Sequence, residues 1–524
     1  MRRASSIAAS LWIAWTLAAQ TTPDLTRHPV SLLEAVERML AQNPLLQIQE
    51  QFVAIGRGQK QIATGQFDIV YTGSLLQTHT TTPLTAAQQA SALESGLEVS
   101  SDAANLTTLD AGATKLFRNG ISVGPTLQVS RTTDNILNQP GLNQSLAAFQ
   151  ITLPLLQGRG RAVVAAPETS AEFDLEASVF TRNQTVSDLL LQTTIAYWND
   201  RASFASLEIA RASESRGARF LEEVQLLVDA GRVAAGELHQ LNANLAQRHA
   251  ARIAAEQVAL AASQQLAISM GTPASSIALI PVARDPFPDW VQDAPVLPER
   301  RIQEAIDGAL QRRADLLAAR SRNQSASVLS VAAKNGLLPR LDVTLAPGYA
   351  GLQEGTGLQK LLGSPFWNVR GANFTGGITY TFPPKNNVAR GRLVQAEAQV
   401  RQTSLEANET ARNIASSVVT SFSALLTSIA QVRNAHDAVL QYQAALEIER
   451  EKFPLERSSL VELLTIEDRL RSAQEAEVDA RLAYAVAIAQ ARYATGTFID
   501  PHQQVNTVNA AIFIEPPPLF GGPS

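Results

Sequence analysis

The residues that could carry chemistry in this 524-residue chain form no catalytic pattern. The six histidines include no pair with metal-ligand spacing on one helix face, and no His-Glu-x-x-His sequence occurs. The run Gly56-Arg57-Gly58-Gln59-Lys60 lacks both the spacing and the Ser or Thr of a P-loop. We therefore predict no metal site, no cofactor and no enzymatic activity, and an exported hydrolase is disfavoured.

The composition excludes further classes of protein. Lys and Arg number 43 and Asp and Glu 48, which gives a net charge of −5 and argues against a nucleic-acid binder. The chain has no cysteine, so disulfides, thiolate metal sites and a lipidated N-terminal cysteine are all excluded.

The N-terminus indicates export. Arg2 and Arg3 precede the apolar run 7–17, and a small residue stands at Ala19. Residues 1–19 therefore read as a secretory signal peptide, with a short buried helix as the alternative. No later stretch reaches about 18 consecutive apolar residues, so entry into a membrane would have to use strands.

The sequence contains an internal duplication. Glu34-Ala35-Val36 recurs as Glu304-Ala305-Ile306, and Gly271-Thr272 recurs as Gly496-Thr497. The two Gly-Thr sequences are closer together along the chain than the two Glu-Ala sequences. The first copy therefore holds about 45 extra residues between its first strand and its long helix. We predict a first repeat over 20–280, a Pro-rich linker over 281–300, a second repeat over 301–500 and a C-terminal tail over 501–524.

Each repeat has the same predicted order of elements. It comprises a helix (31–66 and 301–336), strands (about 67–154 and 339–383) and a helical hairpin (168–270 and 388–495). The extra residues of the first repeat contain Asn119-Gly120, a type I′ hairpin signal, which predicts an additional hairpin near 105–131.

The strand segments alternate with period two. Apolar residues alternate with uncharged polar residues in 121–129, 147–153, 341–349 and 374–382, and more weakly in 69–80. An outer-membrane barrel wall shows this pattern, and so does a half-buried soluble sheet. The signal peptide and the helices favour the barrel. About four strands in the first repeat and two in the second are fewer than the roughly eight that close a barrel, so several chains must share it.

The helical segments are too long for a compact domain. Residues 167–228 and 388–453 contain no interior Pro after their start and one Gly each, which predicts helices of about 90 Å. Ten positions from Leu463 to Ala494 alternate at three-four spacing, and nine of them are apolar, with Glu477 as the exception. This is a coiled-coil seam.

The chain resembles the TolC family of outer-membrane efflux channels. The resemblance covers about residues 30–500 and rests on the segments SLLEAVERMLAQNP, FQITLPLLQGRG, LPRLDVTL and GGITYTFPP, in that order, and on the duplication. It implies a mainly helical fold with membrane strands: a homotrimer with a shared twelve-stranded barrel in the outer membrane and a twelve-helix periplasmic tunnel. The extra hairpin would give eighteen strands if it joined the barrel.

The resemblance also implies a function. The chain would be the passive exit duct of a tripartite efflux pump or a type I secretion system. A periplasmic adaptor (membrane fusion) protein and an inner-membrane pump of the RND or ABC type would open it. The alternative from another class is a non-transport periplasmic coiled-coil scaffold with a soluble sheet.

The helical hairpin tips are the candidate site. Each carries Arg and, five residues later, Glu: Arg232 with Glu237, and Arg457 with Glu462. The family's acidic constriction predicts Glu462, and its repeat mate Glu237, as gate residues, although Glu also suits any helix start. Arg232, Arg457 and Gly231 are candidate tip latches or adaptor contacts. Glu456 occupies the position of the second tip that corresponds to Gly231, where the family has a small residue.

Overall fold

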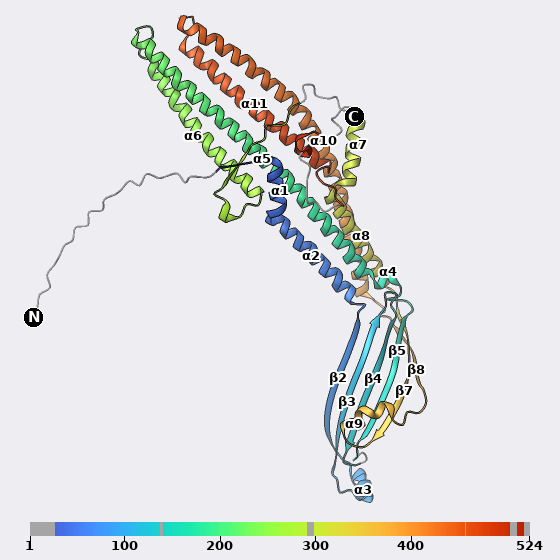
Figure 1. Ribbon diagram of the computed structural model, residues 1–524. Coiled ribbons are helices and arrows are strands. Elements are labelled where there is room, and N and C mark those ends of the chain that lie inside the picture. Colours follow the sequence, from blue (N-terminus) through green and yellow to red (C-terminus); the bar gives the residue numbers. More distant parts are fainter. Residues whose placement is uncertain (1–26, 137–139, 291–297, 456, 503–510, 518–524) are drawn as a thin grey trace, which may run out of the picture.

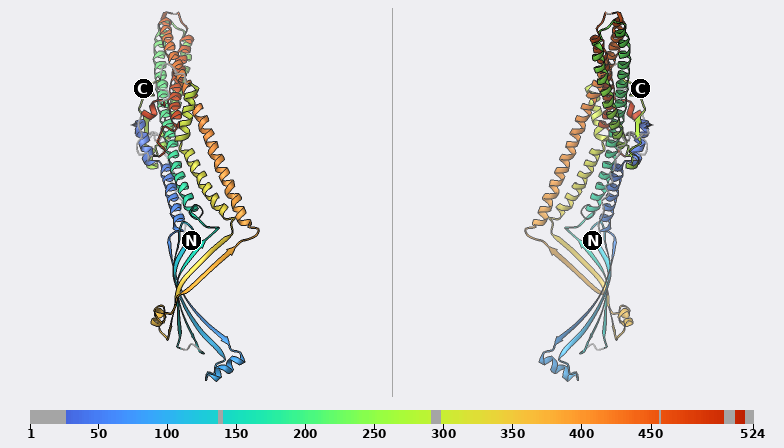
Figure 2. Two further views of the ribbon diagram at one scale, coloured as in Figure 1. Left: turned by 90° about the vertical axis from the view of Figure 1, so that its right-hand side faces the viewer. Right: turned by 90° about the vertical axis from the view of Figure 1, so that its left-hand side faces the viewer.

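The protein is long, with helices at one end and an antiparallel sheet at the other (Figure 1). Figure 2 shows from two further sides that the sheet is strongly twisted. The computed structural model describes residues 27–136, 140–290, 298–455, 457–502 and 511–517. The predicted signal peptide lies outside these residues. The chain passes through the same plan twice, which confirms the internal duplication.

The element bounds follow this plan. The first repeat contains α1 (Leu32–Gln42), α2 (Pro44–Gly65), β2 (Ile69–Pro83), α3 (Ala86–Glu94), β3 (Ser101–Leu116), β4 (Ser122–Asp134), β5 (Leu142–Pro154), α4 (Arg161–Val164), α5 (Ala166–Asp229) and α6 (Glu237–Ser269). The second contains α7 (Glu299–Arg312), α8 (Ala314–Asn335), β7 (Arg340–Glu354), α9 (Leu358–Gly363), η2 (Ser364–Phe366), β8 (Asn373–Thr381), α10 (Asn387–Lys452) and α11 (Leu460–Ala494). The connectors are β1 (Arg27–Val30), η1 (Ala274–Ser276), β6 (Ile280–Ala283), η3 (Phe453–Leu455) and α12 (Ala511–Ile514).

The helices predicted over 31–66 and 301–336 are each broken in two. Asn43 and Arg313, at equivalent positions of the two repeats, have extended backbones that end α1 and α7. Pro44 disfavours a helical Asn43, whose side chain then caps α2. Each break packs against the glycine of a repeated Gly-Thr pair: Asn43 lies against Gly271, and Arg313 against Gly496. The repeated glycines therefore mark repeated contacts.

The long helices match their predicted lengths and pair as predicted. α5 has 64 residues and α10 has 66; α5 packs against α6, and α10 against α11. Of the ten predicted seam positions in α11, eight are buried, and Ile466 and Glu477 are half-buried. The structure thus confirms this seam.

One 18-residue window of α10 is long and apolar enough to cross a membrane by length and composition alone, and 39% of it is buried. The buried apolar residues of this helix, such as Val418 and Phe422, pack in one cluster with Tyr484 and Ile488 of α11. Coiled-coil packing therefore accounts for its apolar character.

The extra hairpin joins the main sheet. The six strands lie in the order β2-β3-β4-β5-β7-β8, and all neighbouring pairs are antiparallel. The inserted strands β3 and β4 lie between β2 and β5. The insertion therefore widens the sheet by two strands.

The turn of this hairpin differs from the type I′ prediction. Type I′ needs a positive φ at both central residues, but in the described chain the non-glycine residues with positive φ are Asn368 and Asn386, not Asn119. Gly120 has φ +95° and its N–H donates to the Phe117 carbonyl, while the Asn119 Oδ1 accepts from the Ile121 N–H. The loop therefore has three residues and ends in a left-handed glycine.

Two regions that were predicted as linker and tail contain ordered contacts. β6 overlaps the start of the linker and pairs in parallel with β1. Phe513 of α12 is fully buried against Phe498, and the Arg492 guanidinium donates to the Glu515 and Pro516 carbonyls. The tail is thus anchored at 511–517. Residues 291–297, 503–510 and 518–524 lie outside the described parts of the chain.

The order of strands predicts which cysteine pairs will cross-link. Leu75, Leu109, Val129 and Ser145 lie in one row across β2 to β5. Cysteines at 75 and 109 should form a disulfide within one chain, because paired residues lie about 5 Å apart. Cysteines at 75 and 145 should not, because three strand spacings separate them by about 14 Å. Peptide mapping under oxidation tests this, and the reverse result would place the extra hairpin outside the sheet.

Candidate channel wall and gate

The sheet has one apolar face. The register places Ala111, Leu127, Ala147 and Tyr349 in one row on that face. Large side chains there are open to the surroundings: Leu75 of β2 is 72% exposed and Ile378 of β8 is 73% exposed. The apolar residues of β7 run from Leu341 to Tyr349, about 27 Å along the strand. A tilt of about 40° reduces this to about 21 Å, close to the apolar band of outer-membrane barrels.

The opposite face is mainly polar, and its charged residues lie chiefly near the strand ends. Ser122, Thr152 and Thr344 share one row on it. Asp110 accepts hydrogen bonds from Ser74 at 3.1 Å and from Gln128 at 3.0 Å, so that this carboxylate is held by neighbouring strands. A sheet with one apolar and one hydrogen-bonding face suits a wall between lipid and water.

Both outer edges of the sheet are open. In the described part of the chain, β2 pairs only with β3, and β8 only with β7. All residues of β8 and all but one of β2 are exposed. Each edge therefore presents a row of unpaired backbone N–H and C=O groups, which can pair with another strand.

The structure brings the two predicted tips to the same end, opposite the sheet (Figures 1 and 2). Gly231, exposed at φ +68°, ends α5: its N–H donates to the Val228 carbonyl, and the Arg232 N–H donates to the Leu227 carbonyl. This is a Schellman ending. Glu237 is half-buried at the start of α6. Gly231 and Arg232 at the first tip therefore form, in the first place, the turn that ends α5.

At the second tip, Ser459 caps α11 and accepts a hydrogen bond from the Glu462 N–H at 3.2 Å. Glu462 and Arg457 are both exposed. Glu456 lies outside the described residues. The carboxylate of Glu462 is thus available in the first turn of a helix, where the helix dipole also favours it.

The structure adds a buried ionic cluster close to the tips, which the sequence analysis did not single out. Glu467 of α11 is buried; its carboxylate accepts from the Arg248 guanidinium of α6 at 2.9 Å and from that of Arg216 of α5 at 3.2 Å. Arg248 also donates to the Ser213 carbonyl and to Asn244. We call Arg216, Arg248 and Glu467 the tip lock, because they join both helical hairpins.

Two sequence signals could have indicated the tip lock. Arg248 lies midway between Leu241 and Ala255 at seven-residue spacing in α6, and a charge on such a packed face demands a partner. Gly217 interrupts α5, where glycine costs about 1 kcal/mol relative to alanine. A β-carbon on Gly217 would lie 3.0 Å from the Arg248 Cδ, so the glycine makes room for the arginine.

Glu477, the charged exception in the seam of α11, also has partners. His436 of α10 lies 3.0 Å from its carboxylate, and Arg481 donates to it at 2.6 Å. Burial raises the pKa of Glu477, but the hydrogen bonds from His436 and Arg481 and their charges outweigh it, so that this pKa lies below its ordinary value. The Glu477 carboxylate therefore connects α11 to α10 through His436.

Catalytic and metal chemistry find no support in the described chain. No group of three or more His, Cys, Asp or Glu residues there could hold a metal ion. Residues Gly120 to Gly124 do spell G-x-S-x-G, a match that the sequence analysis did not take up. Its Ser122 begins β4 of a strand hairpin, whereas a nucleophile elbow requires a strand-to-helix turn.

The tip lock predicts a large difference between two charge-neutralising variants of α11. Glu467→Gln should destabilise the helical region by about 3 kcal/mol, because the buried Arg248 and the half-buried Arg216 lose their counter-charge. Glu475→Gln breaks the partly exposed pair with Arg471 and should change stability by less than about 1 kcal/mol. Urea unfolding followed by helical circular dichroism measures both. Equal effects would show that the buried cluster does not hold the hairpins.

Part of the chain matches a known family. Residues 305–497 match the family model described as outer membrane efflux protein. No curated protein matches the sequence significantly.

Solved channels share the fold. The outer-membrane channel OprN is 16% identical, with a TM-score of 0.65 over 89% of this chain and 90% of that one. The CmeC outer membrane channel of Campylobacter jejuni is 14% identical, with a TM-score of 0.64 over 90% and 87%. The MtrE outer membrane channel of Neisseria gonorrhoeae, solved in its open state, is 15% identical, with a TM-score of 0.61 over 90% and 91%.

The family match lies in the second repeat, and the shared fold extends over the first repeat as well. The second repeat is therefore similar to outer membrane efflux proteins, and most of the chain shares the fold of solved outer-membrane channels.

Proposed function

We propose that three copies of this chain close an eighteen-stranded barrel in the outer membrane. The observation that carries the proposal is the six-stranded sheet with an apolar face and two open edges. In lipid, unpaired backbone groups are too costly to leave at an edge, so β8 of one copy would pair with β2 of the next. The inserted hairpin raises the strand number from the twelve implied by the family resemblance to eighteen. Barrels of 16 to 18 strands enclose an aqueous channel.

The helices of the trimer would form the periplasmic tunnel. α5 alone is about 96 Å long at 1.5 Å per residue. Both hairpin tips lie at the end opposite the apolar band, so the tips would extend into the periplasm when the band lies in the outer membrane. Residues 1–19 would direct export and be removed.

The duct would serve a tripartite efflux pump or a type I secretion system as a passive conduit. A periplasmic adaptor would contact the tips, with Gly231, Arg232 and Arg457 as contact candidates, and an RND or ABC pump of the inner membrane would supply the energy. What supports this role is the match of residues 305–497 to the outer membrane efflux protein family and the exposure of these three residues at the tips.

The gate would lie at the same end. In a trimer, Glu462 contributes three carboxylates to a ring, and Glu237 adds three more. Such rings favour cations and hold back anions. The exposure of Glu462 supports its assignment to the ring.

The trimer is tested by extraction and electrophoresis of the processed protein. It should require detergent, sediment as three copies, resist dissociation in SDS at room temperature and migrate as a single copy after boiling. The cause is the continuous hydrogen-bonded wall between copies. A single copy that stays folded in water without detergent would favour the periplasmic scaffold instead.

The gate is tested in planar bilayers under a salt gradient. Glu462→Gln should lower the preference for cations and move the reversal potential toward zero, because three charges leave the ring. Glu304→Gln removes the same charge from α7, away from the tips, and should leave the reversal potential in place. An unchanged reversal potential for Glu462→Gln would remove Glu462 from the gate, without bearing on the trimer.

A further inference from the structure

The connection between β7 and β8 fills a gap in the sheet. β8 begins at Asn373, opposite Gly348, whereas β7 continues to Glu354. Beyond Gly348, the Leu352 N–H donates to the Trp367 carbonyl at 3.1 Å. Residues 355–372, which contain α9 and η2, thus replace the missing part of β8. Figure 1 shows α9 in front of the sheet, toward the end that carries α3.

This connection is docked on the apolar face of the sheet. Ser364 and Pro365 are buried, and a β-carbon on Gly351 of β7 would overlap the Ser364 carbonyl oxygen. Glycine at 351 therefore lets the η2 backbone rest on the strand. At the start of the connection, the Asn143 Nδ2 donates to the Gln353 and Gly355 carbonyls at 2.8 and 2.9 Å.

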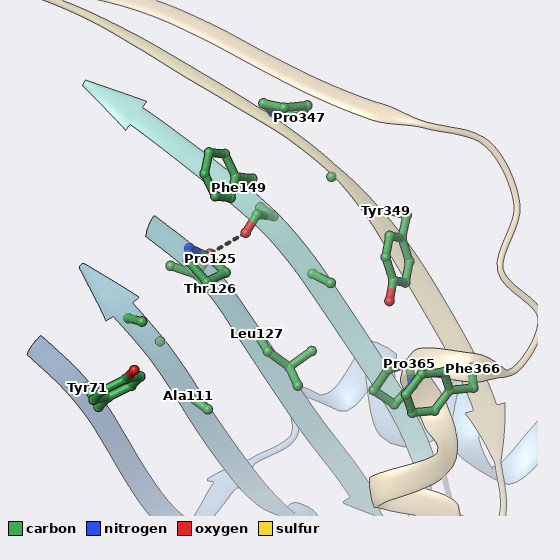
Figure 3. Close-up of a pocket in the computed structure, with 15 residues that line it drawn as sticks. Tyr71, Ala111, Pro125, Thr126, Leu127, Phe149, Pro347, Tyr349, Pro365 and Phe366 are labelled. Atoms are coloured by element: carbon green, nitrogen blue, oxygen red, sulfur yellow. Dashed lines mark hydrogen bonds between the residues drawn. The ribbon is translucent and has the colours of Figure 1, made fainter. Parts of the chain in front are cut away.

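The outer surface of the docked segment is apolar. Leu358 is 67% exposed, Leu362 49% and Phe366 84%. Phe366 and Pro365 close one side of a groove of about 760 Å³ on the face of the sheet. Figure 3 shows Phe366 beside Tyr349, with Leu127 and Phe149 along the same groove.

The position of the groove decides what can cover it. Its floor consists mainly of β3, β4, β5 and β7, the central strands of the sheet, and Tyr71 of the edge strand β2 lines one end. Neighbouring copies of the chain would attach at β2 and β8, at the edges. A neighbouring copy would therefore reach only the Tyr71 end of the groove, whereas lipid reaches all of the outer wall.

The segment is also graded in polarity with depth. Lys360 is exposed and lies next to Gly355, level with the outer end of β7. Phe366 lies one step deeper, with Pro347 and Tyr349 in the apolar band. A cation at the level of lipid headgroups and an aromatic ring among acyl chains is the order found at membrane interfaces.

We propose that residues 355–372 form a membrane-interface anchor. Leu358, Leu362 and Phe366 insert into the outer leaflet, and the groove beside Phe366 holds a lipid acyl chain. The proposal rests on the proposed function, because it takes the apolar face as the outer wall of the barrel.

The absence of cysteine makes a direct depth measurement possible, because a single introduced cysteine takes a nitroxide label uniquely. Phe366→Cys is compared with Leu75→Cys in the band and with Ala90→Cys on α3, all in the full-length processed protein. The protein is reconstituted into phosphatidylethanolamine–phosphatidylglycerol vesicles. Power saturation then compares collisions with oxygen, which enters lipid, and with a nickel chelate, which stays in water.

We expect oxygen collisions to exceed nickel collisions several-fold at 366 and at 75, and the reverse at 90. Dominant nickel collisions at 366 would make the segment a water-exposed loop, and few collisions with either would mean that a second copy covers it. Both results overturn the anchor. Nickel access at 75 would instead contradict the barrel itself.

A positioning variant adds a second test. Gly351→Val should undock η2 and lower the oxygen preference at 366 while leaving the label at 75 unchanged, because a side chain at 351 collides with the Ser364 backbone. An unchanged label at 366 would show that docking on β7 does not place Phe366 in lipid, which overturns the proposed geometry.

Discussion

The architecture depends on the backbone hydrogen bonds at the two edges of one sheet. An apolar face suits lipid, but lipid offers no hydrogen-bonding partner to the open edges of β2 and β8. A single chain with six strands cannot satisfy both conditions. The proposed pairing between copies would satisfy them, and closing the wall would arrange the long helices and the two tips of each copy around the same axis. The constraint would thus link the membrane end of the protein to the proposed gate at the other end.

Much of this architecture could be predicted from the sequence, because it depends on short-range periodicity. The seam of α11 and the strands β4, β5, β7 and β8 follow directly from three-four and period-two patterns. The number of strands followed from comparing the repeats, since the offset between them changes within the strand region. These signals are local, and they can be read without knowing which surfaces pack against each other.

The differences arise where distant residues decide the local backbone. The breaks at Asn43 and Arg313 lie against Gly271 and Gly496, which are far from them in the sequence. The turn at Asn119-Gly120 depends on a single dihedral angle, which the residue types alone leave open. The docking of η2 requires Gly351, whose function is visible only beside Ser364. Sequence patterns identify such residues as unusual but do not identify their partners.

In the candidate site, too, some features follow from the sequence and others only from the packed structure. The exposure of Glu462 follows from its place at a helix start. The tip lock joins Arg216, Arg248 and Glu467 from three helices, and only the packed structure brings them together. Any motion that separates the two hairpins has to break these ion pairs or carry them along. In the proposed duct, the charges near the tips would therefore have two tasks: those at the surface would meet ions and partners, and those inside would hold the hairpins in register.

The number of strands in the assembled wall is the most direct test of the account. Electron cryomicroscopy of the processed protein in lipid nanodiscs should show three copies around one axis and eighteen strands in cross-section, with β8 of each copy paired to β2 of the next. A closed wall of twelve strands with the β3–β4 hairpin outside it, or a single copy whose sheet edges stay open, would contradict it.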